Sequence, residues 1–257
     1  MKISVLGSGS KGNCTLLETA NTKILIDCGF SAKETVKRLA EVGVEASSIN
    51  GIFLTHEHKD HTMGIENFAS KFNVPVFAHS ATLCEYERNL QKNVELNDIV
   101  TQDFYFRELT IAPFEVSHDS KHCSGFSVYC AGEKFSLATD LGFVDERILN
   151  ALKESGTVVI ESNHDPFLLQ HNENYPQILK NRIAGRCGHL SNQECAKTVV
   201  ELAKSGTKNF VLAHLSKENN TALKAKDVTM QSLFASGLEQ NHDLKISVAL
   251  QELVVKV

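Results

Sequence analysis

The sequence predicts an α+β fold in which two β-sheets pack face to face and helices cover their outer sides. Two observations lead to this prediction. Short apolar runs of strand length are separated by helix-length amphipathic segments, and this alternation is repeated in the two halves of the chain. In addition, a chain of 257 residues with 42% hydrophobic residues can bury one large core. A two-sheet sandwich between helices buries one face of every such element.

The first predicted elements are three short strands. Apolar residues recur in β-type runs at residues 3–6, 15–18 and 23–27. The glycine-rich segment 7–13 fits a tight hairpin between the first two runs. It also matches the Gly-x-Gly-x-x-Gly spacing of dinucleotide-binding loops, but that motif requires a helix directly after the glycines, and residues 14–17 continue as a strand. We therefore favour the hairpin.

Helices and strands alternate through the rest of the first half. Ser31 is a suitable N-cap for a helical pattern that extends through Val42. The apolar run 51–54 predicts a further strand. After it we predict, in chain order, a helix over 63–72, a strand over 74–78 and a helix over 80–90.

The second half repeats the alternation. Residues 110–139 are predicted to be mostly strand, with a hairpin turn at 131–133. The apolar runs 157–160 and 210–213 predict two more strands. Helical patterns extend over 145–153, 176–183, 192–204 and 221–236. A final pair of strands closes the chain.

The composition narrows the class of protein. No segment approaches the roughly 18 to 20 consecutive apolar residues of a transmembrane helix, and the first six residues run into glycine and serine too soon for a signal peptide. Seven cysteines form no Cys-x-x-Cys pair, and Cys14, Cys28 and Cys195 lie in apolar patterns typical of reduced core thiols. We expect a cytoplasmic protein without a membrane partner, folded as a single domain over residues 1–257.

The densest cluster of metal-binding residue types follows the predicted strand 51–54. Three of the 11 histidines, His56, His58 and His61, lie within six residues together with Asp60. Imidazole nitrogens and carboxylate oxygens are ligands that zinc, manganese and iron accept, and rigid scaffolds hold such groups in strand-end loops. Because side chains alternate along an extended chain, His56 and His58 point the same way, whereas Asp60 and His61 lie beyond the strand end. One segment could therefore serve two metal ions.

The spacing His-x-His-x-Asp-His resembles the signature of the metallo-β-lactamase superfamily. That resemblance implies three further metal ligands at the ends of later strands: His118, His214, and Asp140 as the residue that bridges both metals. It also implies the αββα architecture, a four-layer sandwich, and two divalent metal ions as cofactors. The ligand types fit zinc or manganese and are compatible with iron.

Further segments narrow the resemblance to the YycJ/WalJ-like subgroup of this superfamily. They lie at residues 7–13, 161–165, 188–192 and 214–220. The subgroup implies a nuclease, an exonuclease acting on DNA. The stretch between Asp140 and His214 is too short for the large cap domain of related RNA-processing enzymes, so we expect none. Polar residues of these segments are expected to bind the substrate: Ser8, Asn13, Asn163 and Ser216.

Two histidines outside the ligand set are candidates for catalysis. His189 precedes Ser191, which with Glu194 fits a helix capping box, and a histidine held rigidly at this point could act as a general acid, as the resemblance to phosphodiesterases implies. His164 follows the run 157–160. Three roles stay open for it: contact with a substrate phosphate, a hydrogen bond to a metal ligand, or a helix cap.

The expected reaction is hydrolysis of a phosphodiester in nucleic acid. Two metals would lower the pKa of a bridging water, Asp60 would hold the resulting hydroxide in line, and His189 would protonate the leaving oxygen. An alternative keeps the site but changes the substrate to a cyclic phosphodiester or a thioester, because fold does not decide substrate. A purely structural metal site is disfavoured, because a closed structural zinc site uses four ligands and this chain offers seven.

Other polar residues stay outside the predicted ligand set. Cys123 lies near His118 in the sequence but is interpreted as a buried thiol, and Asp27 is expected to orient a metal ligand from behind. The remaining histidines are interpreted as structural or exposed: His79, His122, His171 and His242.

The net charge of −5 argues against a broadly basic surface for nucleic acid, although bound metal ions add positive charge that this count omits. Lys180, Arg182 and Arg186 fit two interpretations equally well, a local basic edge or a solvated helix face. The sequence does not indicate an oligomeric state.

Overall fold

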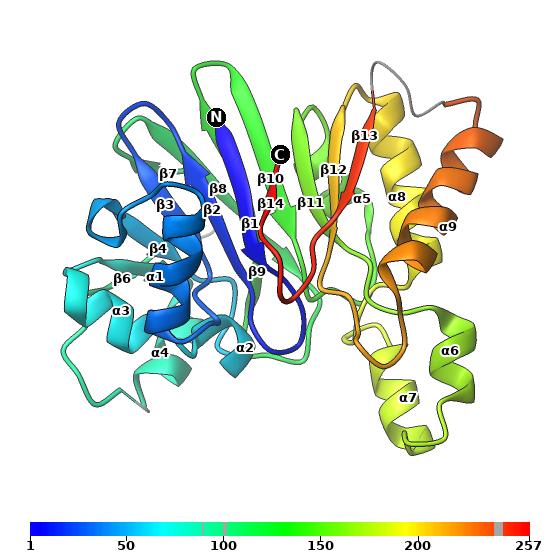
Figure 1. Ribbon diagram of the computed structural model, residues 1–257, viewed down its shortest axis with the longest axis horizontal. Helices are drawn as coiled ribbons and strands as arrows, with labels where there is room; N and C mark the ends of the chain where they lie inside the picture. The colour runs from blue at the N-terminus through cyan, green and yellow to red at the C-terminus, as the bar shows by residue number, and fades with distance from the viewer. Residues whose placement is uncertain (89, 100–101, 239–243) are drawn as a thin grey trace.

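The computed structural model describes residues 1–88, 90–99, 102–238 and 244–257. Over these residues two seven-stranded sheets lie face to face, with helices outside each sheet (Figure 1). The predicted αββα sandwich is therefore confirmed. The first half of the chain forms one sheet and the second half forms the other, except that the C-terminal strand returns to the first sheet.

The first sheet has the strand order β14-β1-β2-β3-β4-β5-β6. Strands β1, β2 and β3 are antiparallel neighbours, which confirms the hairpin at the glycine-rich segment, and β3 to β6 are parallel. The strands are β1 (Lys2–Gly7), β2 (Cys14–Glu18), β3 (Lys23–Ile26), β4 (Gly51–Phe53), β5 (Val76–Ala78), β6 (Leu96–Asp98) and β14 (Val255–Lys256). The helices of this half are α1 (Ala32–Glu41), η1 (Ala46–Ser48), α2 (Lys59–Thr62), α3 (Ile65–Phe72) and α4 (Ser80–Glu87).

The second sheet has the order β13-β12-β11-β10-β9-β8-β7. Its strands are antiparallel from β7 to β10 and parallel from β10 to β13. They are β7 (Phe104–Phe106), β8 (Leu109–Val116), β9 (Cys123–Cys130), β10 (Glu133–Ala138), β11 (Thr157–Glu161), β12 (Asn209–Ala213) and β13 (Lys245–Val248). The helices are α5 (Glu146–Leu152), α6 (Pro166–His171), α7 (Gln177–Ile183), α8 (Asn192–Lys204) and α9 (Ala222–Ala235), of which α6 and α7 lie below the sandwich in Figure 1.

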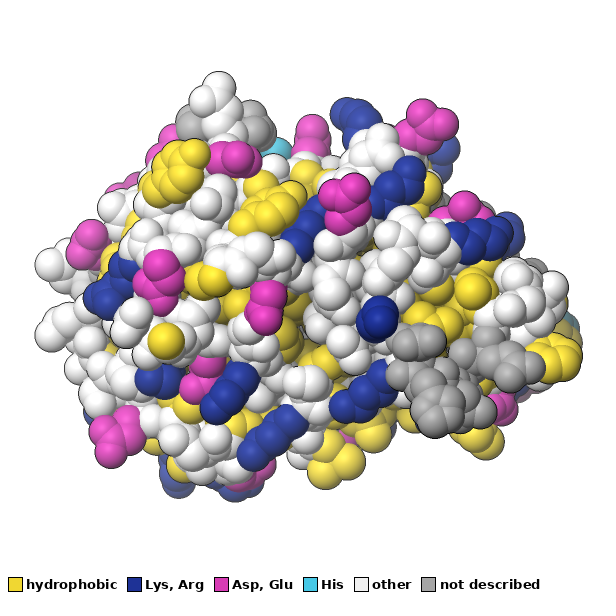
Figure 2. All heavy atoms as spheres, turned by 90° about the horizontal axis from the view of Figure 1, so that it is seen from above, with side chains coloured by type: hydrophobic (Ala, Val, Ile, Leu, Met, Phe, Trp, Pro, Cys, Tyr) yellow, Lys and Arg dark blue, Asp and Glu magenta, His cyan; other side chains and the backbone are white. Residues whose placement is uncertain are grey.

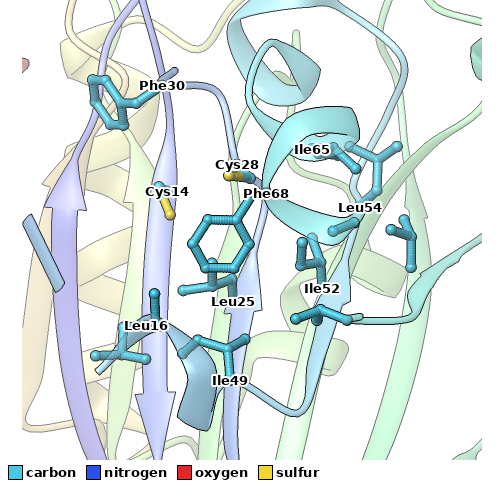
Figure 3. Close-up of a cluster of buried hydrophobic side chains, with 14 of the residues drawn as sticks. Cys14, Leu16, Leu25, Cys28, Phe30, Ile49, Ile52, Leu54, Ile65 and Phe68 are labelled. Atoms are coloured by element: carbon cyan, nitrogen blue, oxygen red, sulfur yellow. The ribbon is translucent and has the colours of Figure 1, made fainter. Parts of the chain in front are cut away.

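Apolar side chains fill the three spaces between the four layers. Phe53, Phe126 and Phe135 pack between the two sheets. Between the first sheet and its helices lies the cluster shown in Figure 3, in which Phe68 of α3 packs against strand residues such as Leu25. Complete burial of a side chain of this size stabilises the fold by roughly 1.5–3 kcal/mol. Because these large apolar residues lie mainly in the strands, the core between the two sheets contributes much of the stability of the fold.

The buried cysteines belong to the same cores. Cys14 and Cys28 lie inside the cluster of Figure 3, and Cys195 is buried with α8 against the second sheet. All three are free thiols, as predicted. Burial raises the pKa of the Cys195 thiol to about 12, so it stays protonated.

Three expectations about the elements need correction. The last two strands do not pair with each other, because β13 extends the second sheet beside β12 and β14 extends the first sheet beside β1. The helix expected over 63–72 is present as α3 but begins at Ile65, and the short helix α2 before it was not predicted; between the two, the amide of Gly64 donates to the carbonyl of Cys28. In addition, α6 was not predicted; Asp165 caps it, and Pro166 starts it. Residue 89, within the helix expected over 80–90, lies outside the described residues.

The two ends of the sandwich differ in character. The end seen from above in Figure 2 carries Lys and Arg side chains interspersed with Asp and Glu. At the opposite end the parallel strands β10, β11 and β12 deliver their C-termini, together with the turns that follow β3 and β4. Among the described residues, no helix is long and apolar enough to cross a membrane.

Candidate metal centre

The loop that carries His56, His58, Asp60 and His61 begins directly after β4 and is fixed by backbone hydrogen bonds. The carbonyl of Asp60 accepts from the amide of Asn13 at 2.8 Å, and that of His61 accepts from the amide of Cys28 at 2.9 Å. A Cβ atom added to Gly29 would lie 1.7 Å from the carbonyl oxygen of Asp60. Glycine at this position therefore allows the turn after β3 to reach the metal-motif loop.

Three strand ends at this edge have left-handed backbone conformations. Asp27 follows β3 with φ 61°, Asp140 follows β10 with φ 58°, and His214 follows β12 with φ 53°. Such conformations are rare for residues with a Cβ and cost on the order of 1–3 kcal/mol each. All three side chains lie in one buried cluster, so the rest of the fold holds strained backbone at this edge.

The seven predicted ligands come together in two groups with Asp140 between them. His56, His58 and His118 form one group, and Asp60, His61 and His214 form the other. Within each group the ligand atoms lie within 4.8 Å of one another. Asp140 forms a third group with His56 and His61, one residue from each of the other two. This geometry suits two cations that share one carboxylate.

Backbone and carboxylate oxygens orient the histidines from behind. Asp27 Oδ2 lies 2.8 Å from Nδ1 of His61, as predicted for Asp27, and the carbonyl of Gly188 lies 3.2 Å from Nδ1 of His118. Glu161 Oε1 lies 2.7 Å from Nδ1 of His214. An acceptor at Nδ1 places the proton there and leaves Nε2 of each ring free as a ligand atom.

The pKa values show how strongly these groups interact. Burial lowers the pKa of His56 and of His118. Burial alone would raise the pKa of Asp140, but His214 and His61 hold it well below its usual range. Burial alone would lower the pKa of His61, yet Asp27 and Asp140 raise it. A cation bound among these groups would displace the proton on Nε2 of a protonated His61, because the ligand nitrogen must be deprotonated.

The donor atoms fit divalent metal ions. Among the described residues, Nε2 of His56, Nε2 of His214 and Oδ2 of Asp140 are buried atoms without a hydrogen-bond partner. Unsatisfied buried polar atoms are costly, and here they converge on the spaces between the ligand groups. Three nitrogens on one side, and two nitrogens with a carboxylate on the other, are donor sets that zinc, manganese and iron accept.

His189 lies beside the ligands. Its Nδ1 is 2.9 Å from Oε1 of Glu161, and its ring centroid is 5.2 Å from those of His118 and of His214. The side chain is 23% exposed, and no described residue hydrogen-bonds to its Nε2. Burial alone would lower its pKa, but Glu161 and Asp140 raise it. Glu161 therefore orients the ring at the rim of the metal site.

Glu161 also groups with Asp140, His189 and His214 as a set of possible metal ligands. Its two oxygens are already used, since Oε1 accepts from both histidines and Oε2 accepts from the amides of Leu141 and Leu190 at 3.0 Å. Burial alone would raise the pKa of Glu161, but His189 and His214 lower it to about 2. We interpret this set as a hydrogen-bonded network and not as a third cation site.

Three of the polar residues expected to bind substrate hydrogen-bond to the turns that carry ligands. Ser8 Oγ accepts from the amide of His214 at 2.8 Å and donates to Oδ1 of Asn13 at 2.9 Å. Asn13 Nδ2 is 3.0 Å from Nε2 of His61. The side-chain Nδ2 of Asn163 donates to the carbonyl of His214 at 2.8 Å. The buried Ser8, Asn13 and Asn163 therefore shape the turns that present ligands, and a direct contact of theirs with substrate stays a prediction.

Ser216 and His164 occupy different environments. Ser216 is half-buried, and its hydroxyl accepts from the amide of Asn219 at 3.2 Å. His164 is buried, its Nδ1 has no hydrogen-bond partner among the described residues, and burial lowers its pKa to about 4. His164 is therefore a neutral imidazole at physiological pH, and a catalytic role for it stays a prediction.

Three residues near the metal site, one cysteine and two arginines, interact with groups outside the ligand set. Cys123 is buried with Sγ 3.7 Å from the carbonyl oxygen of Asp140, and it belongs to none of the ligand groups. Arg182 forms an ion pair with Asp119, next to His118, and so reaches the rim of the site. Arg186 stacks on Phe143 with its guanidinium carbon 3.9 Å from the ring centroid.

The remaining histidines do not join the ligand groups. The rings of His79 and His122 stack with centroids 3.8 Å apart, and His171 stacks on Phe167. His242 lies outside the described residues.

Sequence reasoning missed two residues that orient ligands. Glu161 was noted only as part of a motif, and Thr55, whose hydroxyl lies 3.0 Å from Nδ1 of His56 and also contacts the Asp27 carboxylate, was not noted. The signal for Glu161 was an acid that continues the buried run of β11. An acid is rarely buried unless it is paired, so a partner at that edge was to be expected.

The two-sheet α+β sandwich holds three histidines in one group, and two histidines with an aspartate in the other, at one edge, which is an arrangement suited to a metallohydrolase. This chain belongs to the metallo-β-lactamase superfamily, whose sequence profile matches residues 7–214. It is 32% identical to "Exodeoxyribonuclease YycJ" of Bacillus anthracis, over 92% of this chain and 90% of that protein. It is 33% identical to "Exodeoxyribonuclease WalJ" of Streptococcus pneumoniae (strain D39), over 95% and 93%. The chain is therefore a metal-dependent hydrolase of the YycJ/WalJ-like subgroup.

Solved structures share the fold at low identity. The metallo-beta-lactamase fold protein YhfI from Bacillus subtilis superposes with a TM-score of 0.74 at 16% identity, and covers 100% of this chain and 99% of that one. Human tRNase Z, short form, gives a TM-score of 0.66 at 16% identity, and covers 99% and 98%. These similarities support the αββα architecture. At 16% identity they do not indicate the substrate.

Proposed function

We propose that the chain is a nuclease that holds two divalent metal ions, zinc or manganese, and shortens DNA from an end. One observation carries the proposal: a partly exposed histidine, His189, is oriented by Glu161 at the edge of the paired ligand groups. The relatives named exodeoxyribonuclease, which match nearly the whole chain, support DNA as the substrate. We further propose that residues 1–257 form one domain without a large cap.

The metal ions, when bound, would lower the pKa of a water molecule and neutralise charge on the phosphoryl oxygens. The protein's own residues supply the rest. The side chain of Asp60 is 24% exposed, and His214 and His61 lower its pKa although burial opposes this. An ionised Asp60 would accept a hydrogen bond from the attacking water and orient it.

His189 would act at the opposite side of the phosphorus atom. With Nδ1 bound to Glu161, the proton on Nε2 is available to the leaving oxygen. A phosphodiester has a poor alkoxide leaving group and gains from such an acid. A thioester has a good leaving group and gains less, so the histidine favours a phosphodiester.

The proposal is tested with protein stripped of metal and reloaded with manganese or zinc, on end-labelled single- and double-stranded DNA. We expect progressive end-shortening by the wild type, a loss of roughly 10²–10⁴-fold in kcat for His189→Ala, and no activity for Asp140→Ala. His189→Ala should retain its bound metal, whereas Asp140→Ala should not. His171→Ala, an exposed histidine stacked on Phe167, serves as the matched control.

Absence of DNA cleavage with either metal would contradict the proposal. Hydrolysis of a cyclic phosphodiester or a thioester by the same preparation would then identify the alternative substrate class. Cleavage by His189→Ala at the wild-type rate would contradict the role of the histidine alone.

A further inference from the structure

A pocket of about 440 Å³ lies beside the second ligand group and is not used by the mechanism above. Its walls come from three segments: the hairpin after β1, the chain that follows His214, and residues 249–252 before β14. Tyr175, between α6 and α7, closes one side. In Figure 1 these loops lie at the lower edge of the sandwich. The volume is within the range of small-molecule sites.

None of the seven ligands lines the pocket, but residues of its wall contact or directly follow the ligand His214. Ser8 lines the pocket, and its hydroxyl accepts the amide proton of His214 at 2.8 Å. Leu215 and Ser216 also line it and directly follow His214. The wall of the pocket is therefore connected to a metal ligand through one hydrogen bond and through the adjacent chain, which suits a subsite for a part of the substrate outside the bond that is cut.

Hydrogen bonds hold the walls in place. Gln251 Oε1 accepts from the amide of Lys11 at 2.8 Å, and Gln251 Nε2 donates to the carbonyl of Gly12 at 2.8 Å. Across the pocket, Asn172 Nδ2 donates to Oδ1 of Asn219 at 2.7 Å, which fastens the segment of Tyr175 to the chain after His214. A preformed pocket loses little entropy when a ligand enters.

The side chains that line the pocket suit one nucleotide. Tyr175 is a half-exposed aromatic ring, and every nucleobase can stack on such a ring. Lys11 and Lys217 are exposed, and neither forms an ion pair with any residue of the described ranges. Their ammonium groups are available to a phosphate. Stacking and phosphate binding together are the two contacts that single-stranded nucleic acid requires.

The charge of the pocket limits what it can hold. Glu218 and Glu252 also line it, so two acids balance the two lysines. A balanced pocket does not attract a long polyanionic strand as a basic groove does. It accommodates one phosphate near the lysines, in agreement with the net charge of −5 of the whole chain.

We propose that this pocket binds the terminal nucleotide of a DNA strand, with its base on Tyr175 and its phosphate between Lys11 and Lys217. The inference rests on the proposed function and deepens it, because a pocket that takes one terminal unit explains attack at an end. It also assigns a substrate-binding role to the hairpin after β1, whose Ser8 connects the bound nucleotide to His214.

The test uses metal-loaded full-length protein and a short single strand with phosphorothioate linkages, which resist cleavage, and one 2-aminopurine. We expect 2-aminopurine at one strand terminus to be quenched on binding, and an internal one to be quenched much less. Tyr175→Leu should abolish the terminal quench, and Lys11→Gln with Lys217→Gln should weaken binding. The matched controls are Tyr105→Leu, on an exposed ring of β7, and Lys2→Gln, at the far end of β1.

Kinetics with cleavable DNA give a second readout. Tyr175→Leu should raise KM roughly tenfold or more, as expected for the loss of one base–aromatic stack, and leave kcat within about twofold. Wild-type cleavage of DNA together with an unchanged KM and quench in Tyr175→Leu would overturn the pocket assignment and leave the nuclease standing. Equal quenching of terminal and internal 2-aminopurine would likewise overturn it. A wild type that cleaves no DNA would overturn the proposed function itself.

Discussion

Glu161 Oε1 and His214 Nδ1 lie 2.7 Å apart, and this contact links the buried end of β11 to a metal ligand at the end of β12. The same oxygen accepts from His189 at 2.9 Å. One carboxylate therefore orients a histidine of the ligand group and the histidine at the rim. Its own position is fixed by the amides of Leu141 and Leu190.

Replacement of this carboxylate should weaken metal binding without removing a ligand. In Glu161→Gln, an NH2 group replaces one carboxylate oxygen and cannot accept a hydrogen bond. The side chain can then no longer accept all four hydrogen bonds, so the rings of His214 and His189 lose their fixed orientation. We expect metal affinity to fall by roughly 10–100-fold. Competition with a chromogenic chelator measures this directly. Glu173→Gln, at an exposed position, is the control, and equal affinities in the two variants would contradict the orienting role.

The close approach of two backbones at Gly29 gives a second prediction. In Gly29→Ala, the ideal position of the new Cβ lies 1.7 Å from the carbonyl oxygen of Asp60, so the carbonyl must move away. We expect a loss of roughly 1–3 kcal/mol in the free energy of unfolding, together with weaker metal binding, because the metal-motif loop shifts. Urea denaturation and metal titration check the two effects. Gly156→Ala, whose Cβ would have only Lys134 O at 3.8 Å, should change neither.

Metal loading should stabilise the fold, because each ligand group takes residues from both sheets. His118 from the second sheet joins His56 and His58, and His214 joins Asp60 and His61. At a free metal concentration 100 times Kd, binding adds about 2.7 kcal/mol. For a chain of this size Tm should then rise by roughly 5–10 °C.

Thermal melts of stripped protein, with and without zinc, measure this shift. Calcium, which prefers all-oxygen sites, should have little effect. The rise in Tm with zinc should be reduced in His118→Ala. An identical Tm with and without zinc would show that the groups do not bind the ion in the folded state.

The pH dependence of stability should depend in part on Glu108, far from the metal site. Its two carboxylate oxygens accept from the hydroxyls of Thr19 and Thr22 at 2.5 and 2.6 Å, and these bonds lower its pKa from 4.5 to about 2. Because the pKa in the folded state is lower than in the unfolded chain, this stabilisation is complete above pH 4.5 and is lost as the pH falls towards 2. The group is exposed, so the effect is small.

Glu108→Gln should therefore lower Tm near neutral pH and match the wild type near pH 2. Melts across this range, beside Glu45→Gln as an exposed control, test the sign. A difference in Tm that grows towards acid would contradict it.

Local patterns in the sequence predicted the elements that carry the ligands. The apolar runs before His56, Asp140 and His214 form the strands β4, β10 and β12, as their apolar β-type residues predicted. Ser31 and Ser191 cap α1 and α8 as expected, since a hydroxyl before a helical pattern has a local physical role. The end of each strand could therefore be read from a few neighbouring residues.

Contacts between distant segments could not be read in this way. Glu161 meets His214 only because β11 and β12 are adjacent parallel strands. Their register places Glu161 opposite Ala213, the residue before His214. The burial of Asn163 and the return of β14 to β1 also depend on the assembled layers. Each is set by tertiary packing, which no local window contains.

The left-handed turns at Asp27, Asp140 and His214 have a consequence for engineering. Glycine at any of them would relax the backbone, yet it would remove a carboxylate or an imidazole that the site requires. Substitutions at these three positions could relieve backbone strain and so stabilise the fold, but they would also remove groups that the site needs for activity. Thermostable variants are better sought in the outer helices, where stability and turnover do not compete for the same residue.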